Sequence, residues 1–182
     1  MLLETPICDF DFDAPKFELK DFSGKVYTLD DIRGKNGTLV AFICNHCPYV
    51  KAIVDRFVDD VKVLQKNGFG VVAIMSNNCE EYPEDSPEKM KEFTLKNGFS
   101  FPYLIDDTQE IAKKYNAVCT PDFFGFDREL KLGYRGRLDN LDISTHEPRE
   151  RIPELLNAML NINDTEVDNQ IPSMGCSIKW KS

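Results

Sequence analysis

From residue 39 to residue 48 the chain reads Leu39-Val40-Ala41-Phe42-Ile43-Cys44-Asn45-His46-Cys47-Pro48. The five apolar residues that open this stretch are typical of a strand that is buried on both faces. Proline suits the first turn of a helix, and apolar residues recur after it at spacings of three and four. The pattern therefore predicts a strand over residues 38–43, a helix over residues 48–67, and two cysteines at the junction between them.

The two thiols at this junction, Cys44 and Cys47, are three residues apart and can close and reopen a disulfide. The unpaired N–H groups and the macrodipole at a helix amino terminus stabilise negative charge, and thiolate is the reactive form of cysteine. The context therefore favours redox chemistry. Two alternatives stay open. The thiols can pack as small apolar side chains, or they can ligate zinc, although a zinc site usually has about four ligands.

The remaining cysteines and histidines do not support a zinc site, so we expect no bound metal. The other cysteines are scattered singly: Cys8, Cys79, Cys119 and Cys176. The two histidines are His46 and His146. In a reducing compartment, a paired-thiol motif of this kind is more often catalytic or metal-binding than structural.

Composition limits the class of protein. A chain of 182 residues with a hydrophobic fraction of 42% is expected to form one domain over residues 1–182 with a real core. A formal net charge of -9 argues against nonspecific nucleic-acid binding and against anionic membrane surfaces. No stretch approaches the roughly 20 apolar residues of a transmembrane helix, and residues 1–6 lack the features of a signal peptide. We therefore expect a cytoplasmic protein with no nucleic-acid or membrane partner.

Strand and helix patterns alternate along the rest of the chain. The expected strands cover residues 16–20 and 25–29 as an amino-terminal hairpin, then 38–43, 70–75, 101–106, 123–127 and 131–136. The expected helices cover residues 30–34, 48–67, 86–97, 108–115 and 148–161. Ser86 suits a helix cap and Pro87 the first helical position. Residues 76–85 read as a polar surface loop, and residues 163–182 as a mostly irregular tail. This alternation predicts an α/β domain with parallel strands, helices on both faces and a closing antiparallel hairpin.

Three stretches taken together carry a resemblance that covers nearly the whole chain. They are residues 42–51 around the paired thiols, residues 118–124 with Thr120-Pro121, and residues 175–180. They resemble the peroxiredoxin-like (AhpC/TSA) branch of the thioredoxin superfamily, in a subgroup with a C-x-x-C motif. The resemblance implies an α/β, thioredoxin-like fold with an amino-terminal β-hairpin, an inserted helix and a central mixed sheet flanked by helices.

The resemblance also implies a thiol-disulfide oxidoreductase, in which Cys44 attacks a disulfide and Cys47 resolves the mixed disulfide. Thr120-Pro121 matches the cis-proline step of the family, which lies beside the active disulfide and helps to bind the substrate backbone. The alternative is an ordinary proline at a strand start. No organic cofactor is implied. The implied partners are protein or small-molecule disulfides and a dithiol that supplies electrons.

His46 directly precedes Cys47, as a histidine does in the disulfide isomerases and oxidases that this motif resembles. An imidazole near Cys44 would stabilise its thiolate and favour the reduced form. We therefore expect a couple more oxidising than that of thioredoxin, which is about -270 mV. The alternative is a solvent-facing histidine without a redox role.

The dipeptide Cys47-Pro48 also matches the peroxidatic cysteine of peroxiredoxins. In that alternative Cys47 attacks the O–O bond of a peroxide, and Cys44 or Cys119 resolves the product. The usual threonine of the peroxiredoxin motif is absent, since Cys44 occupies its position, and Arg135 is the candidate for the active-site arginine. Efficient peroxidase activity is therefore in doubt. A nonenzymatic redox-sensing module is a further alternative.

Two single cysteines have a conditional place in this scheme. Cys119 lies two residues before Pro121, and either packs as a small apolar group or acts as a second resolving thiol. Cys176 can reach a disulfide partner only if the tail folds back over the domain. The sequence leaves the oligomeric state open.

Overall fold

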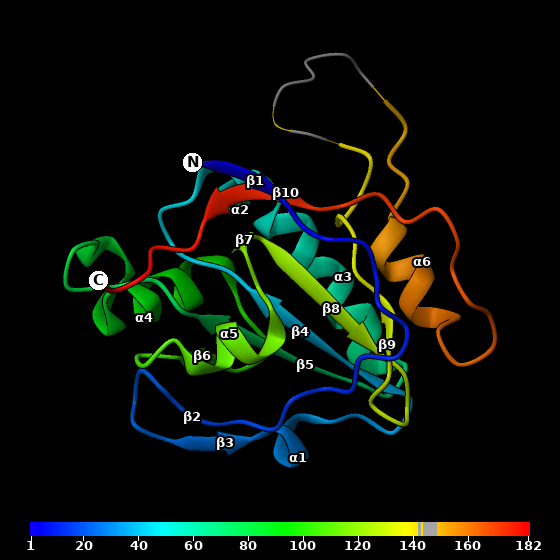
Figure 1. The fold of residues 1–182 in the computed structure, drawn as a ribbon, viewed down its shortest axis with the longest axis horizontal. Coiled ribbons are helices and arrows are strands. Elements are labelled where there is room, and N and C mark those ends of the chain that lie inside the picture. Colours follow the sequence, from blue (N-terminus) through cyan, green and yellow to red (C-terminus); the bar gives the residue numbers. More distant parts are fainter. Residues whose placement is uncertain (142, 144–148) are drawn as a thin grey trace.

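The computed structural model describes residues 1–141, 143 and 149–182. A seven-stranded mixed sheet runs through its centre in the order β3-β2-β6-β5-β4-β8-β9 (Figure 1). Its strands are β2 (Glu18–Asp21), β3 (Val26–Thr28), β4 (Gly37–Phe42), β5 (Phe69–Met75), β6 (Tyr103–Ile105), β8 (Asp122–Phe126) and β9 (Leu132–Tyr134). The three strands β4, β5 and β6 are parallel, and the other pairings are antiparallel. The predicted hairpin, parallel strands and closing antiparallel hairpin are confirmed.

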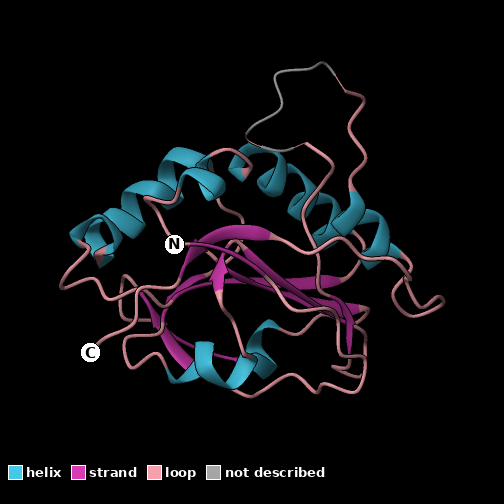
Figure 2. Cartoon of the chain, turned by 45° about the horizontal axis from the view of Figure 1, so that its top comes forward, coloured by secondary structure: helices cyan, strands magenta, loops and turns pink. Residues whose placement is uncertain are grey.

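Helices cover both faces of this sheet (Figure 2). They are α1 (Leu29–Ile32), α2 (Pro48–Lys51), α3 (Val54–Lys66), α4 (Pro87–Asn97), α5 (Glu110–Tyr115) and α6 (Glu154–Leu160). Every residue of β4 is buried, and successive side chains of a strand point to opposite faces. Leu39 and Ala41 therefore pack with the apolar sides of α2, α3, α4 and α6. Val40 and Phe42 pack with those of α1 and α5.

The helix predicted over residues 48–67 is divided into α2 and α3. At the break, the N–H of Ile53 donates to the carbonyl of Val50, three residues back, instead of to the residue four back. The N–H of Phe57 then donates to Ile53 and resumes the regular helical spacing. Periodicity alone did not show this break, because the apolar spacing continues through it.

The other helices agree with the sequence to within their ends. The hydroxyl of Ser86 accepts the N–H of Lys89 and caps α4, and Pro87 follows as predicted. Helix α5 begins at Glu110 instead of residue 108. The predicted start of the last helix, residue 148, lies outside the described residues, and α6 itself begins at Glu154, directly after a proline.

Most of the tail at residues 163–182 is irregular, as the sequence predicts, but residues 174–177 form a strand that the sequence did not predict. Strand β10 (Met174–Ser177) lies between β1 (Leu2–Glu4) and β7 (Cys119–Thr120) in a second, antiparallel sheet of three strands. Figure 1 shows β10 in red beside the blue β1. The sequence of β10 shows no alternation of apolar and polar residues, so only its pairing with distant strands makes it a strand.

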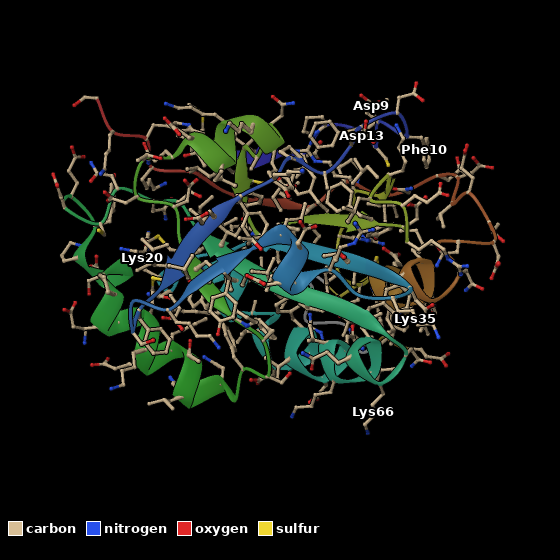
Figure 3. The ribbon with its side chains drawn as sticks, turned by 90° about the horizontal axis from the view of Figure 1, so that it is seen from below. Asp9, Phe10, Asp13, Lys20, Lys35 and Lys66 are labelled. Carbon is tan, nitrogen blue, oxygen red and sulfur yellow. The ribbon has the colours of Figure 1, made fainter. Side chains whose placement is uncertain are left out.

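Charged side chains gather at the surface. The alternating Asp9, Asp11 and Asp13 are all exposed, and Lys66 at the end of α3 points away from the sheet into solvent (Figure 3). Asp13 pairs with Lys131 at 2.9 Å. Among the described residues, no helix combines the length and the apolar character that crossing a membrane requires.

Candidate active site

The two paired thiols lie where the sequence predicts, in the turn that joins β4 to α2. Cys47 is the N-cap of α2 and Pro48 is its first residue. The residues are almost fully buried, with exposed fractions of 1% for Cys44 and 0% for Cys47. Both are free thiols, so the structure describes the reduced pair.

Thr120, at the end of strand β7, contacts both thiols. Its peptide bond to Pro121 is cis, as the resemblance implies. Its hydroxyl lies 3.5 Å from the sulfur of Cys44, and its carbonyl oxygen lies 3.3 Å from the sulfur of Cys47. The structure therefore brings the thiol pair, Cys44 and Cys47, together with Thr120 and Pro121, which lie in a distant part of the sequence.

The surroundings of the pair favour a thiolate on Cys47 over one on Cys44. A hydrogen bond from the Cys44 thiol lowers the pKa of Cys47 to about 4, against the effect of burial, with further help from Thr120 and from the backbone N–H groups of Cys176 and Val50. The same hydrogen bond, together with burial and the nearby carboxylate of Asp85, raises the pKa of Cys44. The electrostatics therefore favour Cys47 as the nucleophile, whereas the resemblance gave that role to Cys44.

Asp85, at the end of the 3-10 turn η1 (Pro83–Asp85), is completely buried beside the pair. One carboxylate oxygen accepts the backbone N–H of Asn45 at 2.8 Å. The other accepts the amide of Asn77 at 2.9 Å and lies 2.6 Å from Nδ1 of His46. His46 also stacks on Tyr82, with 5.8 Å between ring centroids. Nδ1 of His46 therefore lies against Asp85 without the geometry of a hydrogen bond, and the effect of His46 on the Cys44 thiolate stays a prediction.

The cluster of Cys44, His46 and Asp85 bears on the zinc alternative. One ligand atom from each lies within 4.8 Å of the others. Tetrahedral ligands at about 2.0–2.1 Å from a zinc ion stand about 3.3 Å apart, which is longer than the 2.6 Å between His46 and Asp85. This contact is therefore too short for two ligands of one zinc ion.

The loop over residues 76–85 is exposed at residues 80, 81, 83 and 84, as predicted for a surface loop, but residues 76–78 and Asp85 are buried, and the prediction is corrected there. Its buried polar residues are Ser76, Asn77, Asn78 and Asp85. Each has a partner elsewhere in the chain: Ser76 donates to Asp106 at 2.8 Å, and the side chain of Asn77 accepts the N–H of Lys179 at 2.9 Å. Polar side chains are buried where such partners exist, and the sequence of the loop does not reveal those partners.

Arg135, the candidate for the arginine of a peroxidase, is already paired. Its guanidinium is buried, donates to the carboxylate of Asp122 at 2.9 Å and to the carbonyl of Asn116 at 2.9 Å, and lies 4.4 Å from the ring centre of Phe124. The charge of this arginine is therefore neutralised within the domain, and its role at a peroxide stays a prediction without support from this contact.

The folded-back tail brings Cys176 to the pair, which meets the condition set by the sequence. Cys176 lies opposite Thr120 in the small sheet and packs against the cluster of buried residues that contains Cys44 and Cys47. Asp85 is the residue of the site that the sequence reasoning missed. Its acidic neighbours and its place before a helix cap gave only the signal of an exposed loop.

Comparison with known proteins agrees with this arrangement. The AhpC/TSA family model matches residues 12–135, which is more than half of the chain. The chain belongs to the AhpC/TSA family. The curated protein "Thiol-disulfide oxidoreductase ResA" from Geobacillus kaustophilus is 30% identical over 135 residues, which cover 73% of either chain.

Solved structures extend the likeness to the whole chain. The crystal structure of an uncharacterized conserved protein from Geobacillus kaustophilus is 42% identical, has a TM-score of 0.92, and covers 100% of this chain and 97% of its own. The thioredoxin domain of a thiol-disulfide oxidoreductase from Bacteroides vulgatus is 17% identical, with a TM-score of 0.59 over 74% of this chain and 89% of its own. The predicted thioredoxin-like α/β fold is confirmed.

Proposed function

We propose that this chain is a thiol-disulfide oxidoreductase that exchanges a dithiol for a disulfide at Cys44 and Cys47. The observation that carries the proposal is the single thiolate of a buried pair of thiols, held against Thr120 and the cis-Pro121. The name of the ResA relative supports it, because that protein is 30% identical to this chain over 135 residues.

The exchange follows from the charges of the pair. The thiolate of Cys47 attacks one sulfur of a substrate disulfide, forms a mixed disulfide and releases the other sulfur as a thiolate, which takes up a proton. Cys44 then loses its proton and attacks the sulfur of Cys47, so that the Cys44–Cys47 disulfide forms and the second substrate thiol leaves. A partner dithiol reverses these steps and restores the reduced pair.

Asp85 and His46 are placed to handle the proton of Cys44. The Cys44 sulfur, an Asp85 oxygen and an imidazole nitrogen of His46 all lie within 4.8 Å of one another. The Asp85 carboxylate can accept the proton as Cys44 attacks, and His46, whose side chain is 25% exposed, connects this carboxylate to solvent.

Reduction of insulin disulfides, driven by dithiothreitol, tests the proposal. The wild-type chain and the control Cys79→Ser should reduce insulin at equal rates, because Cys79 is outside the pair. Cys47→Ser should lose the activity, and Cys44→Ser should still form a mixed disulfide through Cys47 but should lose the resolution of that disulfide by Cys44. A wild-type chain that does not accelerate insulin reduction, or a Cys47→Ser variant as active as the wild type, contradicts the proposal.

The redox potential gives a second test of the same site. Stabilising the Cys47 thiolate favours the reduced form, so the couple should be more oxidising than the roughly -270 mV of thioredoxin. Equilibration with glutathione measures this potential, and a value at or below that of thioredoxin would show that the thiolate does not tune the couple.

A thiol peroxidase is the second candidate, favoured by one observation. Cys47 caps a helix directly before Pro48 and has a lowered pKa, which suits attack on a peroxide. Hydrogen peroxide should then convert Cys47 to a sulfenic acid in Cys44→Ser, and a dimedone adduct on Cys47 at substoichiometric peroxide would support this candidate. Slow reaction with peroxide beside fast insulin reduction leaves the oxidoreductase as the function.

The partners follow from the chemistry of the pair. Protein disulfides and a dithiol reductant are the partners that the exchange requires, and small-molecule disulfides are a further proposal. The cytoplasmic location also stays a prediction. Trapping mixed disulfides of Cys44→Ser in cells and identifying the fraction that contains them tests both.

A further inference from the structure

We propose that Cys176 is a third redox thiol, which takes the disulfide over from the Cys44–Cys47 pair by exchange at Cys47. This inference rests on the proposed function, since it supplies a further step for the same disulfide. Its basis is the placement of strand β10 beside the pair.

The register of the small sheet directs Cys176 at the pair. Cys176 lies opposite Thr120 in the antiparallel pairing of β10 with β7. Side chains of directly opposed residues share one face of a sheet. The side chain of Thr120 contacts the sulfur of Cys44, so Cys176 faces the same pocket. Cys176 also packs against the cluster of buried residues that contains Cys44 and Cys47.

The same register sets Cys119 apart. Cys119 precedes Thr120 in β7, and adjacent residues of a strand point to opposite faces. Its sulfur lies 3.7 Å from the carbonyl oxygen of Pro121, and it lies opposite Ser177 in the pairing with β10. Of the two single cysteines near the pair, Cys176 is therefore the one that faces Cys47.

Several contacts fix β10 in this position. A Cβ atom on Gly175 would lie 1.8 Å from the carbonyl oxygen of Thr120, so only glycine permits this close approach of the two backbones. The hydroxyl of Ser173 donates to the carbonyl of Pro121 at 2.8 Å, and the N–H of Ser177 donates to the carbonyl of Met1 at 2.8 Å. The strand is thus part of the built site.

Exposure distinguishes Cys176 from the pair. Cys44 and Cys47 are buried, whereas Cys176 is partly exposed. A disulfide that includes Cys176 therefore lies nearer the surface than one between Cys44 and Cys47, and is more accessible to a protein partner. The third thiol connects the buried pair with a protein partner outside.

The transfer needs no oxidant beyond the exchange already proposed. The thiolate of Cys176 attacks the Cys47 sulfur of the Cys44–Cys47 disulfide. The Cys47–Cys176 bond forms, the Cys44–Cys47 bond breaks, and Cys44 leaves as a thiolate that takes up the proton lost by Cys176. The number of disulfides and of thiols stays the same.

The experiment treats reduced Cys44→Ser, as the full chain, with one equivalent of glutathione disulfide. Cys47 should first carry glutathione, and Cys176 should then displace it, so that peptide mapping finds the Cys47 peptide linked to the Cys176 peptide. In Cys44→Ser/Cys176→Ser the glutathione should stay on Cys47, and Cys44→Ser/Cys79→Ser should behave like Cys44→Ser. Lasting glutathione on Cys47 of Cys44→Ser, or a link to Cys119, overturns the proposal.

A second measurement keeps the test decisive if Cys44→Ser does not fold. The wild-type chain is equilibrated across a series of glutathione redox buffers, quenched with acid and mapped. A Cys47–Cys176 linkage at any step supports the proposal, and its absence across the whole series overturns it. An active wild-type chain without this linkage refutes the relay alone, whereas an inactive chain refutes the proposed function.

Discussion

Two buried carboxylates flank the candidate site, and their surroundings differ. Asp122 and Asp85 both have exposed fractions of 0%. Asp122 faces the guanidinium of Arg135 at 2.9 Å, a group that keeps its charge at any ordinary pH. Asp85 faces two amide donors and the partly exposed imidazole of His46 instead.

This difference separates a structural charge from a functional one. The pair of Asp122 and Arg135 holds a fixed charge distribution behind the cis-proline loop, and no proton needs to move there. Asp85 instead lies within reach of Cys44 and of the imidazole of His46, which is the arrangement that the proposed proton transfer uses. Equal burial therefore does not mean an equal role, because the partner decides whether a carboxylate anchors the fold or handles a proton.

The largest expected effect comes from removing the fixed cation. Arg135→Met leaves Asp122 buried without its partner, so the free energy of unfolding should fall by about 3–5 kcal/mol. Urea denaturation of the reduced chain measures this loss. The double variant Arg135→Met/Asp122→Asn is the control, and it should recover part of the stability. A loss below about 1 kcal/mol in the single variant would mean that water or another group compensates Asp122.

The second-largest expected effect is a loss of activity when Asp85 is replaced. Asp85→Asn keeps the shape of the side chain but cannot accept the proton of Cys44, so insulin reduction should slow by about 100-fold, the lower end of what positioned proton transfer contributes. Stability should change less than in Arg135→Met. Equal activity of Asp85→Asn and the wild type would assign Asp85 a structural role like that of Asp122.

The pH dependence of stability separates the thiolate from both carboxylates. The pKa of Cys47 is lowered to about 4 in the folded chain, against about 8.5 for a free cysteine. The stabilisation is therefore fully present above about pH 8.5 and is lost as the pH falls through about 4, with a slope of at most about 1.4 kcal/mol per pH unit. Unfolding of reduced wild type and Cys47→Ser between these limits measures it. Parallel profiles for the two chains would place the thiolate elsewhere.

The smallest expected effect is on stability and comes from Ser86, the helix cap that directly follows Asp85. Ser86→Ala removes the cap of α4 and should lower the free energy of unfolding by about 1 kcal/mol. Insulin reduction should stay near the wild-type rate, because the hydrogen bonds of Asp85 to Asn45 and Asn77 remain. Ser86→Thr is the matched control, since threonine also caps. A large loss of activity in Ser86→Ala alone would show that the cap positions Asp85.

The parts of the molecule that the sequence predicts are those fixed by local signals. The apolar run of β4 and the proline after Cys47 act within a few residues, so they place the two thiols at the strand–helix junction. Asp85 and β10 depend on partners elsewhere in the chain. The Asp85 carboxylate is buried because the backbone N–H of Asn45 and the side-chain amide of Asn77 donate hydrogen bonds to it. Residues 174–177 form the strand β10 because they pair with β1 and β7. Neither these hydrogen bonds nor this strand pairing can be read from the residues next to Asp85 or within β10.

The covering of the pair by β10 has a consequence for the order of synthesis. Cys47 and its helix emerge from the ribosome long before Met174–Ser177, which form β10. Until that strand is made and docks against Thr120, the nascent chain leaves Cys47 without its backbone donor from Cys176. During synthesis, Cys44 and Cys47 are therefore not yet covered by β10. The site is complete only when β10 pairs with β7.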